Sequence, residues 1–117
     1  MQKIPLPLGL FLNFPSQQTV RAAFFVLYLS SRTIGNAFAD LTKNAKVRCV
    51  NYNEADLITC FSNDYGYEKW IAKAIDFYSD EKDVLILISS SGKSKNMINA
   101  CNSAREKKIS KIITFTG

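Results

Sequence analysis

Four short apolar runs alternate along the chain with longer segments in which apolar residues recur every three or four positions. Continuous apolar runs of four to eight residues are typical of strands buried on both faces, whereas the longer spacing indicates amphipathic helices. The predicted strands cover residues 22–29, 46–52, 83–89 and 111–117. The predicted helical segments cover residues 30–44, 54–78 and 93–108, the second broken around 63–67.

This strand–helix alternation predicts the fold class. Buried strands that alternate with amphipathic helices form a parallel sheet with helices on both faces, which makes the protein α/β. The chain has 117 residues, enough for one domain. All three prolines lie within the first 15 residues, at positions 5, 7 and 15, so we expect residues 1–21 to be an irregular or disordered lead-in. Residues 22–117 then form the domain.

Charge and composition narrow the function classes. The net charge is +5, which suits anionic small molecules and also nucleic acids. Basic residues are interspersed with acidic ones from Lys43 onward, which argues against a nucleic-acid partner. The apolar stretches near the start are too short and too broken to span a bilayer, so we expect no membrane partner.

Cysteine and histidine usage bears on location and metals. Cys49, Cys60 and Cys101 are an odd set without C-x-x-C spacing, and we interpret them as small core residues of a protein in a reducing, cytoplasmic compartment. The chain contains no histidine, the commonest metal ligand and general acid or base. We therefore expect neither a metal site nor a cofactor.

The most informative stretch follows the third predicted strand and reads SSSGKS, residues 89–94. Its Gly-Lys-Ser ending matches the last positions of the nucleotide-binding P-loop, but that loop needs a glycine at position 87, where Leu87 stands. Hydroxyl side chains, a glycine and a helix N-terminus together favour a smaller anion such as a sugar phosphate. The alternative is a polar loop in which Ser94 caps the following helix. The position of the loop at the carboxyl end of a parallel strand favours the ligand site.

Three stretches of the sequence resemble segments of a known protein family, and they occur along the chain in the same order as in that family. "DVLILISSSGKSKNM" with the later "TFTG", "SNDYGYEKW" at residues 62–70, and "FADLTKN" at residues 38–44 are similar to segments of sugar isomerase (SIS) domains, in particular of the phosphoheptose isomerase branch. The resemblance covers about residues 30–117. It implies a three-layer α-β-α fold with flavodoxin-like strand order, here lacking the usual C-terminal elements.

The resemblance also implies a substrate and site residues. Members of this branch interconvert sedoheptulose 7-phosphate and a heptose 7-phosphate by aldose–ketose isomerisation, as homotetramers with sites between subunits. The resemblance assigns Asp40 as the catalytic carboxylate and Asp64 and Ser31 as further substrate contacts. The residues that it assigns to the substrate phosphate are Ser89, Ser90, Ser91, Gly92 and Ser94. Lys93 is a further candidate for phosphate contact.

The chain departs from the family pattern in three ways. The family's G-N-G-G-S after the first strand is replaced by "VLYLSS", the C-terminal helix with the catalytic histidine is missing, and Asp40 stands where a glutamate is usual. We therefore expect a truncated or altered relative whose activity is open. The last predicted strand also leaves part of one sheet face without a covering helix, so we expect a further segment or a partner there.

Alternative interpretations remain at this stage. The chain could be a non-catalytic module that binds a sugar phosphate or assembles with full-length subunits. A flavodoxin-like protein that holds a flavin phosphate is a third possibility, although its loop would follow the first strand. Asp40 could simply pair with Lys43 on a helix surface, and Asp64 could belong to a turn. Trp70 and the aromatic residues near it, Phe77 and Tyr78, are predicted to lie in the core.

Overall fold

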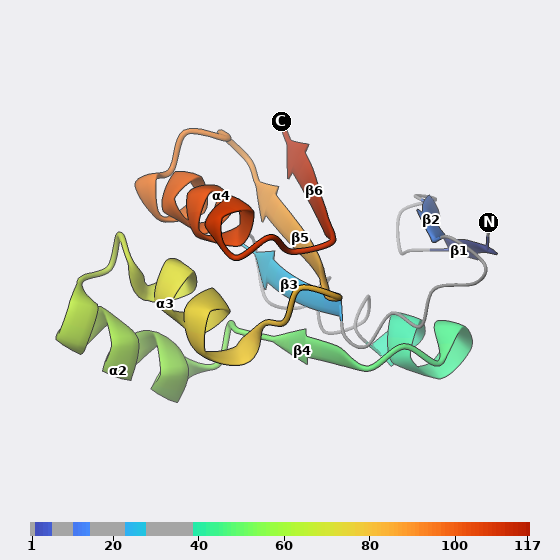
Figure 1. Ribbon diagram of the computed structural model, residues 1–117, viewed down its shortest axis with the longest axis horizontal. Helices are drawn as coiled ribbons and strands as arrows, with labels where there is room; N and C mark the ends of the chain where they lie inside the picture. Colours follow the sequence, from blue (N-terminus) through green and yellow to red (C-terminus); the bar gives the residue numbers. More distant parts are fainter. Residues whose placement is uncertain (1, 6–10, 15–22, 28–38) are drawn as a thin grey trace.

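The computed structural model describes residues 2–5, 11–14, 23–27 and 39–117 (Figure 1). Its strands are β1 (Gln2–Pro5), β2 (Phe11–Phe14), β3 (Ala23–Leu27), β4 (Cys49–Asn51), β5 (Val84–Ser89) and β6 (Lys111–Thr116). Its helices are α2 (Ala55–Tyr65), α3 (Trp70–Tyr78) and α4 (Lys95–Glu106), and residues 39–45 are also helical. Strands and helices alternate from β3 onward, as the sequence pattern predicts.

The four strands from β3 to β6 form one parallel sheet in the order β4-β3-β5-β6. Numbered from β3, this is the flavodoxin-like order 2-1-3-4 that the family resemblance implies. The strand β5 lies between β3 and β6, and all but one of its residues are buried. This central position explains why its sequence is a continuous apolar run rather than an alternating one.

Helices cover both faces of the sheet, so the predicted three-layer α/β architecture is confirmed. On one face, Leu85 and Leu87 of β5 belong to the apolar core formed with α3 and α4. On the other face, Val84 and Ile86 pack with Leu41 of the helical residues 39–45. Successive β5 side chains thus alternate between the two helix layers, as the two-residue period of a strand requires.

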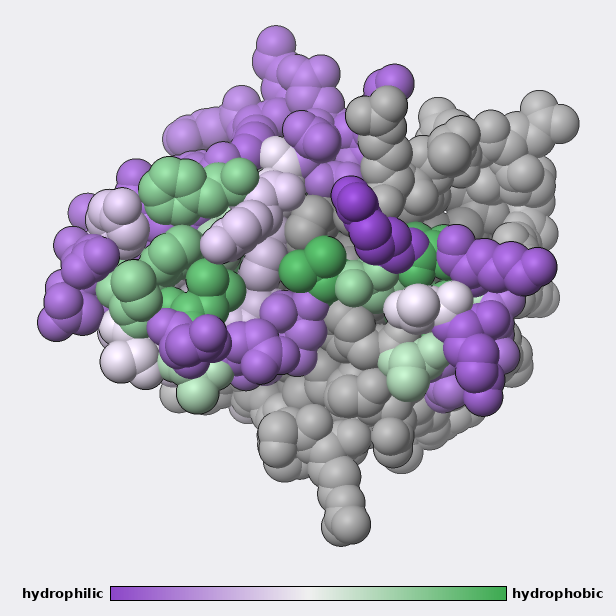
Figure 2. Space-filling view, turned by 90° about the horizontal axis from the view of Figure 1, so that it is seen from below, coloured by the Kyte–Doolittle hydropathy of each residue, from purple (hydrophilic) through white to green (hydrophobic). Residues whose placement is uncertain are grey.

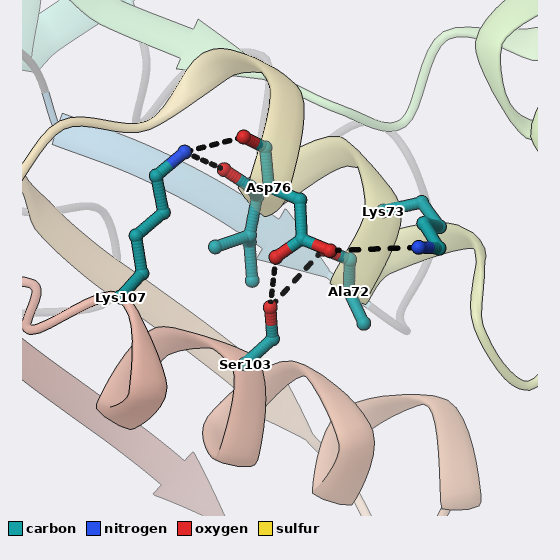
Figure 3. A network of polar contacts seen from close by, with 6 residues as sticks. Ala72, Lys73, Asp76, Ser103 and Lys107 are labelled. Atoms are coloured by element: carbon teal, nitrogen blue, oxygen red, sulfur yellow. Dashed lines mark hydrogen bonds and ion pairs between the residues drawn. The ribbon is translucent and has the colours of Figure 1, made fainter.

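Polar contacts fix α4 against α3 (Figure 3). The Ser103 hydroxyl of α4 donates a hydrogen bond to the Asp76 carboxylate at 2.6 Å. The Lys107 ammonium group donates to the Ile75 carbonyl at 3.1 Å and to the Asp76 carbonyl. Because these carbonyls belong to the last turn of α3, Lys107 supplies the cation and the donors that a helix C-terminus lacks. These contacts therefore hold α3 and α4 together as one helix layer on the same face of β5.

The aromatic residues at the end of α3 depart from the core prediction. Trp70 is buried, with 3% of its surface exposed, but Phe77 and Tyr78 are 60% and 55% exposed. Phe77 lies beside Phe61 of α2, with ring centroids 5.6 Å apart, instead of packing on the sheet. The helix α2 itself has no buried residue. Figure 2 shows apolar residues gathered over α2 and α3 with hydrophilic residues around them.

The break between α2 and α3 falls at Gly66, within the predicted residues 63–67. Gly66 has φ of +89°, a conformation that side-chain-bearing residues rarely adopt. Its N–H donates to the Ser62 carbonyl at 2.9 Å, which closes the last turn of α2. The predicted break in this helical segment is therefore present, and it occurs because Gly66 leaves the helical conformation.

Two segments of the expected irregular lead-in, residues 2–5 and 11–14, form strands, and the rest of residues 1–21 lies outside the described residues. The strands β1 and β2 pair in antiparallel fashion, with Gln2 opposite Phe14 and Pro5 opposite Phe11. Pro5 has no N–H to donate, but a proline is tolerated in an edge strand, and both strands of a two-stranded sheet are edges. The proline content therefore did not prevent strand formation. None of the described helices is long and apolar enough to cross a membrane.

A buried carboxyl lies at the amino-terminal end of β5. Asp83 is 2% exposed, and its Oδ2 accepts a hydrogen bond from the Asp80 N–H at 2.6 Å. Its Oδ1 has no hydrogen-bond partner among the described residues. Burial raises the pKa of Asp83 above its ordinary value of 3.8. The hydrogen bond from the Asp80 N–H and the charges of Arg48 and Lys107 lower the pKa, and the charge of Asp80 raises it, but burial is the largest effect. Folding therefore favours the protonated form of this carboxyl.

This arrangement predicts a pH-dependent stability. A group whose pKa is raised by folding binds protons more tightly in the folded state, so the free energy of unfolding falls as pH rises above the ordinary aspartate pKa. We expect wild-type protein to lose more stability than Asp83→Asn between pH 4.5 and 7.5, measured by urea unfolding under reducing conditions. The chain has no histidine to obscure this interval. Parallel pH profiles for the two proteins would contradict the assignment.

Candidate functional site

The candidate site is the serine loop, residues 89–94, which joins the carboxyl end of β5 to the N-terminus of α4 (Figure 1). From β3 the chain continues to β4 on one side, whereas β5 lies on the other side of β3. The boundary between β3 and β5 is therefore the topological switch point of the sheet, where open α/β sheets bind their ligands. The loop begins at this boundary and lies at the carboxyl end of a parallel strand, as the sequence predicts.

Two hydroxyl groups of the serine loop accept hydrogen bonds from its own backbone. Ser89 Oγ accepts from the Gly92 N–H at 3.1 Å, and Ser91 Oγ accepts from the Lys93 N–H at 3.2 Å. A serine hydroxyl that accepts a hydrogen bond still has its own hydrogen to donate. Ser89 and Ser91 can thus shape the loop and donate to an anion at the same time, without breaking a loop contact.

Ser94 occupies the N-cap position of α4 but does not cap the helix with its side chain. Its backbone is extended, with φ of −63° and ψ of 128°, and its hydroxyl makes no capping hydrogen bond. Its carbonyl instead accepts from the N–H groups of Met97 and Ile98, both at 3.1 Å. The simple capping interpretation of Ser94 is therefore wrong. Its hydroxyl is left for another acceptor.

The N-terminal end of α4 adds positive electrostatic potential to the serine loop. The first N–H groups of a helix have no acceptor within it, and the helix dipole gives this end a partial positive charge. The flanking residues Lys93 and Lys95 are exposed cations. Lys95 forms an ion pair with Glu68 at 3.2 Å, with both side chains more than half exposed, so solvent weakens that pair. The combination favours an anionic ligand.

Asp64 lies in a segment that reaches the same end of α4. It is an exposed residue at the end of α2, and its Oδ1 accepts from the Asn63 side chain at 3.2 Å. The turn after it is held on α4, because the Glu68 carbonyl accepts from the Asn99 side chain at 2.9 Å and the Glu68 carboxylate pairs with Lys95. The fold thus brings the Asp64 segment to the helix that the serine loop precedes.

Asp40 is not brought to the serine loop within one chain. It is half-buried next to Leu41, which packs with Val84 and Ile86 in the first half of β5. The serine loop leaves the other end of that strand, and five residues of a strand span roughly 16 Å. Figure 1 likewise shows the helical residues 39–45 away from the serine loop. Ser31 lies outside the described residues.

Thr116 and Gly117 lie against the serine loop, although the sequence pattern gave them no role in the site. The Gly117 N–H donates to the Ser90 carbonyl at 3.2 Å. A Cβ atom placed on Gly92 would lie 2.9 Å from Thr116 Cγ2. The signal that could have identified them is the Thr-Gly ending of the last strand, which is the neighbour of β5 in a sheet of this order.

The three cysteines do not contribute to this site. Cys49 and Cys101 are half-buried, and burial raises the pKa of both thiols, so they are poor nucleophiles. Cys60 is exposed on α2, which corrects the expectation that all three cysteines are core residues.

Comparison with known proteins agrees with this geometry. The model of the SIS domain family matches residues 22–117. The phosphoheptose isomerases of Hamiltonella defensa and Proteus mirabilis are each 48% identical to the chain over 60 residues, 51% of this chain and 29% and 31% of those proteins. The chain therefore spans less than a third of these curated relatives in the matched region.

Solved structures give the same relationship at the level of the fold. A phosphoheptose isomerase from Francisella tularensis matches 83% of this chain and 52% of its own, with a TM-score of 0.69 and 25% sequence identity. The enzyme from Neisseria gonorrhoeae matches 80% of this chain and 52% of its own, with a TM-score of 0.64 and 25% identity. With its parallel sheet and its serine loop at the switch point, the chain belongs to the SIS domain family and resembles its phosphoheptose isomerases.

Proposed function

We propose that the serine loop binds the phosphate group of a phosphosugar. The observation that carries this proposal is the hydrogen-bonding state of the loop. Ser89 and Ser91 already accept backbone N–H groups, so their remaining hydrogens are donors, and the Ser94 hydroxyl makes no capping bond. Three hydroxyl donors beside a helix N-terminus match the several acceptor oxygens and the charge of a phosphate.

The proposed substrate is sedoheptulose 7-phosphate, in keeping with the phosphoheptose isomerases that the chain resembles. Aldose–ketose isomerisation moves a proton between two neighbouring carbons and needs a base for that step. Asp40 is the proposed base, and Asp64 and Ser31 are proposed contacts to the sugar. Since Asp40 lies next to Leu41, which packs at the opposite end of β5, a second copy of the chain is proposed to supply it. The working form is then a cytoplasmic homo-oligomer, a tetramer by resemblance.

A second candidate function is a phosphosugar-binding module without catalysis. The absence of histidine from the sequence favours it, because the commonest general acid for protonating the sugar oxygens is then missing. Such a module would bind sedoheptulose 7-phosphate through the same loop and release it unchanged. The two candidates share the phosphate site and differ only in turnover.

The phosphate site is tested with Ser94→Ala. Because the Ser94 hydroxyl makes no capping bond, its removal is expected to change the free energy of unfolding by less than about 0.5 kcal/mol, against about 1 kcal/mol for a typical N-cap serine. Loss of one hydrogen bond to a charged ligand is expected to weaken binding of sedoheptulose 7-phosphate by about tenfold or more, measured by calorimetry. Ser110→Ala, at an exposed serine away from the loop, is the matched control. Unchanged affinity in Ser94→Ala would contradict the assignment of this hydroxyl.

Turnover separates the two candidate functions. For an isomerase, wild-type protein converts sedoheptulose 7-phosphate to the aldose, and Asp40→Asn abolishes conversion while binding persists, because the amide cannot act as a base. The assay follows aldose formation by NMR and binding by a ligand-dependent thermal melt, in which ligand at 100 times its dissociation constant stabilises by about 2.7 kcal/mol. Binding without turnover by the wild type would select the module.

A further inference from the structure

We infer that Thr116 and Gly117 are positioning residues for phosphate binding: they hold the backbone of the serine loop in the shape that aims its hydroxyl groups at the ligand. This inference rests on the proposed phosphate-binding function and adds to it the residues that set the affinity without touching the ligand. Thr116 is the last residue of the neighbouring strand β6 and Gly117 follows it, more than twenty positions along the chain from the loop.

The first contact is between Gly92 and Thr116. Gly92 has φ of +65°, which any residue with a Cβ adopts only with strain. A Cβ at this position would also lie 2.9 Å from Thr116 Cγ2 and 3.2 Å from Thr116 Cβ. The side chain of Thr116 therefore lies directly against the loop backbone, and it leaves no room for the loop to move toward β6.

The second contact is between Gly117 and Ser90. The Gly117 N–H donates to the Ser90 carbonyl at 3.2 Å, and a Cβ on Gly117 would lie 2.8 Å from that same oxygen. The oxygen belongs to the backbone, so it cannot rotate aside as the end of a flexible side chain could. Gly117 thus permits the close approach of its own backbone to that of Ser90, and the hydrogen bond fixes it.

The two contacts extend the sheet into the loop. Ser89 is paired with Thr116 at the last position of the β5–β6 register. The Gly117–Ser90 hydrogen bond continues this pairing by one residue beyond the strands, and the Thr116 side chain supports Gly92 from the same side. Ser89, Ser90 and Gly92 are thereby fixed to a rigid element before any ligand arrives. Such preorganisation raises affinity because the loop loses little freedom on binding.

The experiment compares Gly92→Ala, Thr116→Ser, the double variant and Gly66→Ala. Calorimetry measures the affinity for sedoheptulose 7-phosphate, and urea unfolding measures stability. Gly66 is the control, because it also has positive φ but a Cβ there would meet no atom within 4 Å. We expect Gly92→Ala to weaken binding at least tenfold and Thr116→Ser, which removes Cγ2, to restore most of that affinity in the double variant. Gly66→Ala should lose stability through backbone strain, and adding Thr116→Ser to it should restore neither stability nor affinity.

Gly117→Ala gives a second, independent variant. Its new methyl group meets the Ser90 carbonyl and not Thr116, so we expect weaker binding that Thr116→Ser does not restore. If Gly92→Ala does not fold, hydrogen exchange of the Gly117 amide in the wild-type protein tests the same contact. Exchange at least a hundredfold slower than in an unstructured peptide, and slower again with ligand, supports the inference, and exchange at the unstructured rate overturns it.

The outcomes separate this inference from the proposed function. Wild-type protein that does not bind sedoheptulose 7-phosphate overturns the proposed function, and the positioning role with it. Wild-type binding together with unchanged affinity in Gly92→Ala and Gly117→Ala overturns the positioning role alone. Weaker binding in Gly92→Ala that Thr116→Ser fails to restore also overturns it, because the loss then comes from backbone strain and not from the contact.

Discussion

The parallel pairing of β5 between β3 and β6 is the constraint on which the rest of the structure depends. It buries β5 on both faces and aligns its carboxyl end with that of β6. The serine loop can therefore rest on Thr116 and Gly117, while α4 returns over the sheet and is anchored to α3 by Ser103 and Lys107. A slip of one residue in the β5–β6 register would turn the buried side chains over and separate the loop from its support.

The pairing of β5 with β6 also fixes the serine hydroxyl groups of the loop before a ligand binds. A loop that had to form its shape on binding would lose backbone freedom, at a free-energy cost of about 1–2 kcal/mol per residue. Here the backbone of the loop is already tied to its own serines and to β6. The remaining donors then act as a fixed set, which suits a compact, highly charged group such as a phosphate better than a large flexible ligand.

Sequence patterns predicted the strands of the parallel sheet and the serine loop because each depends on local spacing or on a contiguous motif, whereas the sheet order followed from the family resemblance. They missed Thr116 and Gly117 because that contact joins residues far apart in the chain and depends on register. They also placed Phe77 and Tyr78 in the core, since a helical stripe does not reveal whether it faces the sheet or a neighbouring helix such as α2. Proline content likewise gave no hint of the β1–β2 pairing.

A nuclear magnetic resonance titration of the wild-type chain with sedoheptulose 7-phosphate tests the central claim most directly. Amide resonances report each backbone N–H separately, so they distinguish binding at the serine loop from binding elsewhere. If the serine loop binds the phosphate, we expect saturable shifts for the amides of residues 89–96 and of Gly117, with the amides at the C-terminal end of α3 unchanged. Shifts confined to the exposed aromatic residues of α2 and α3, or no saturable shift at all, would contradict it.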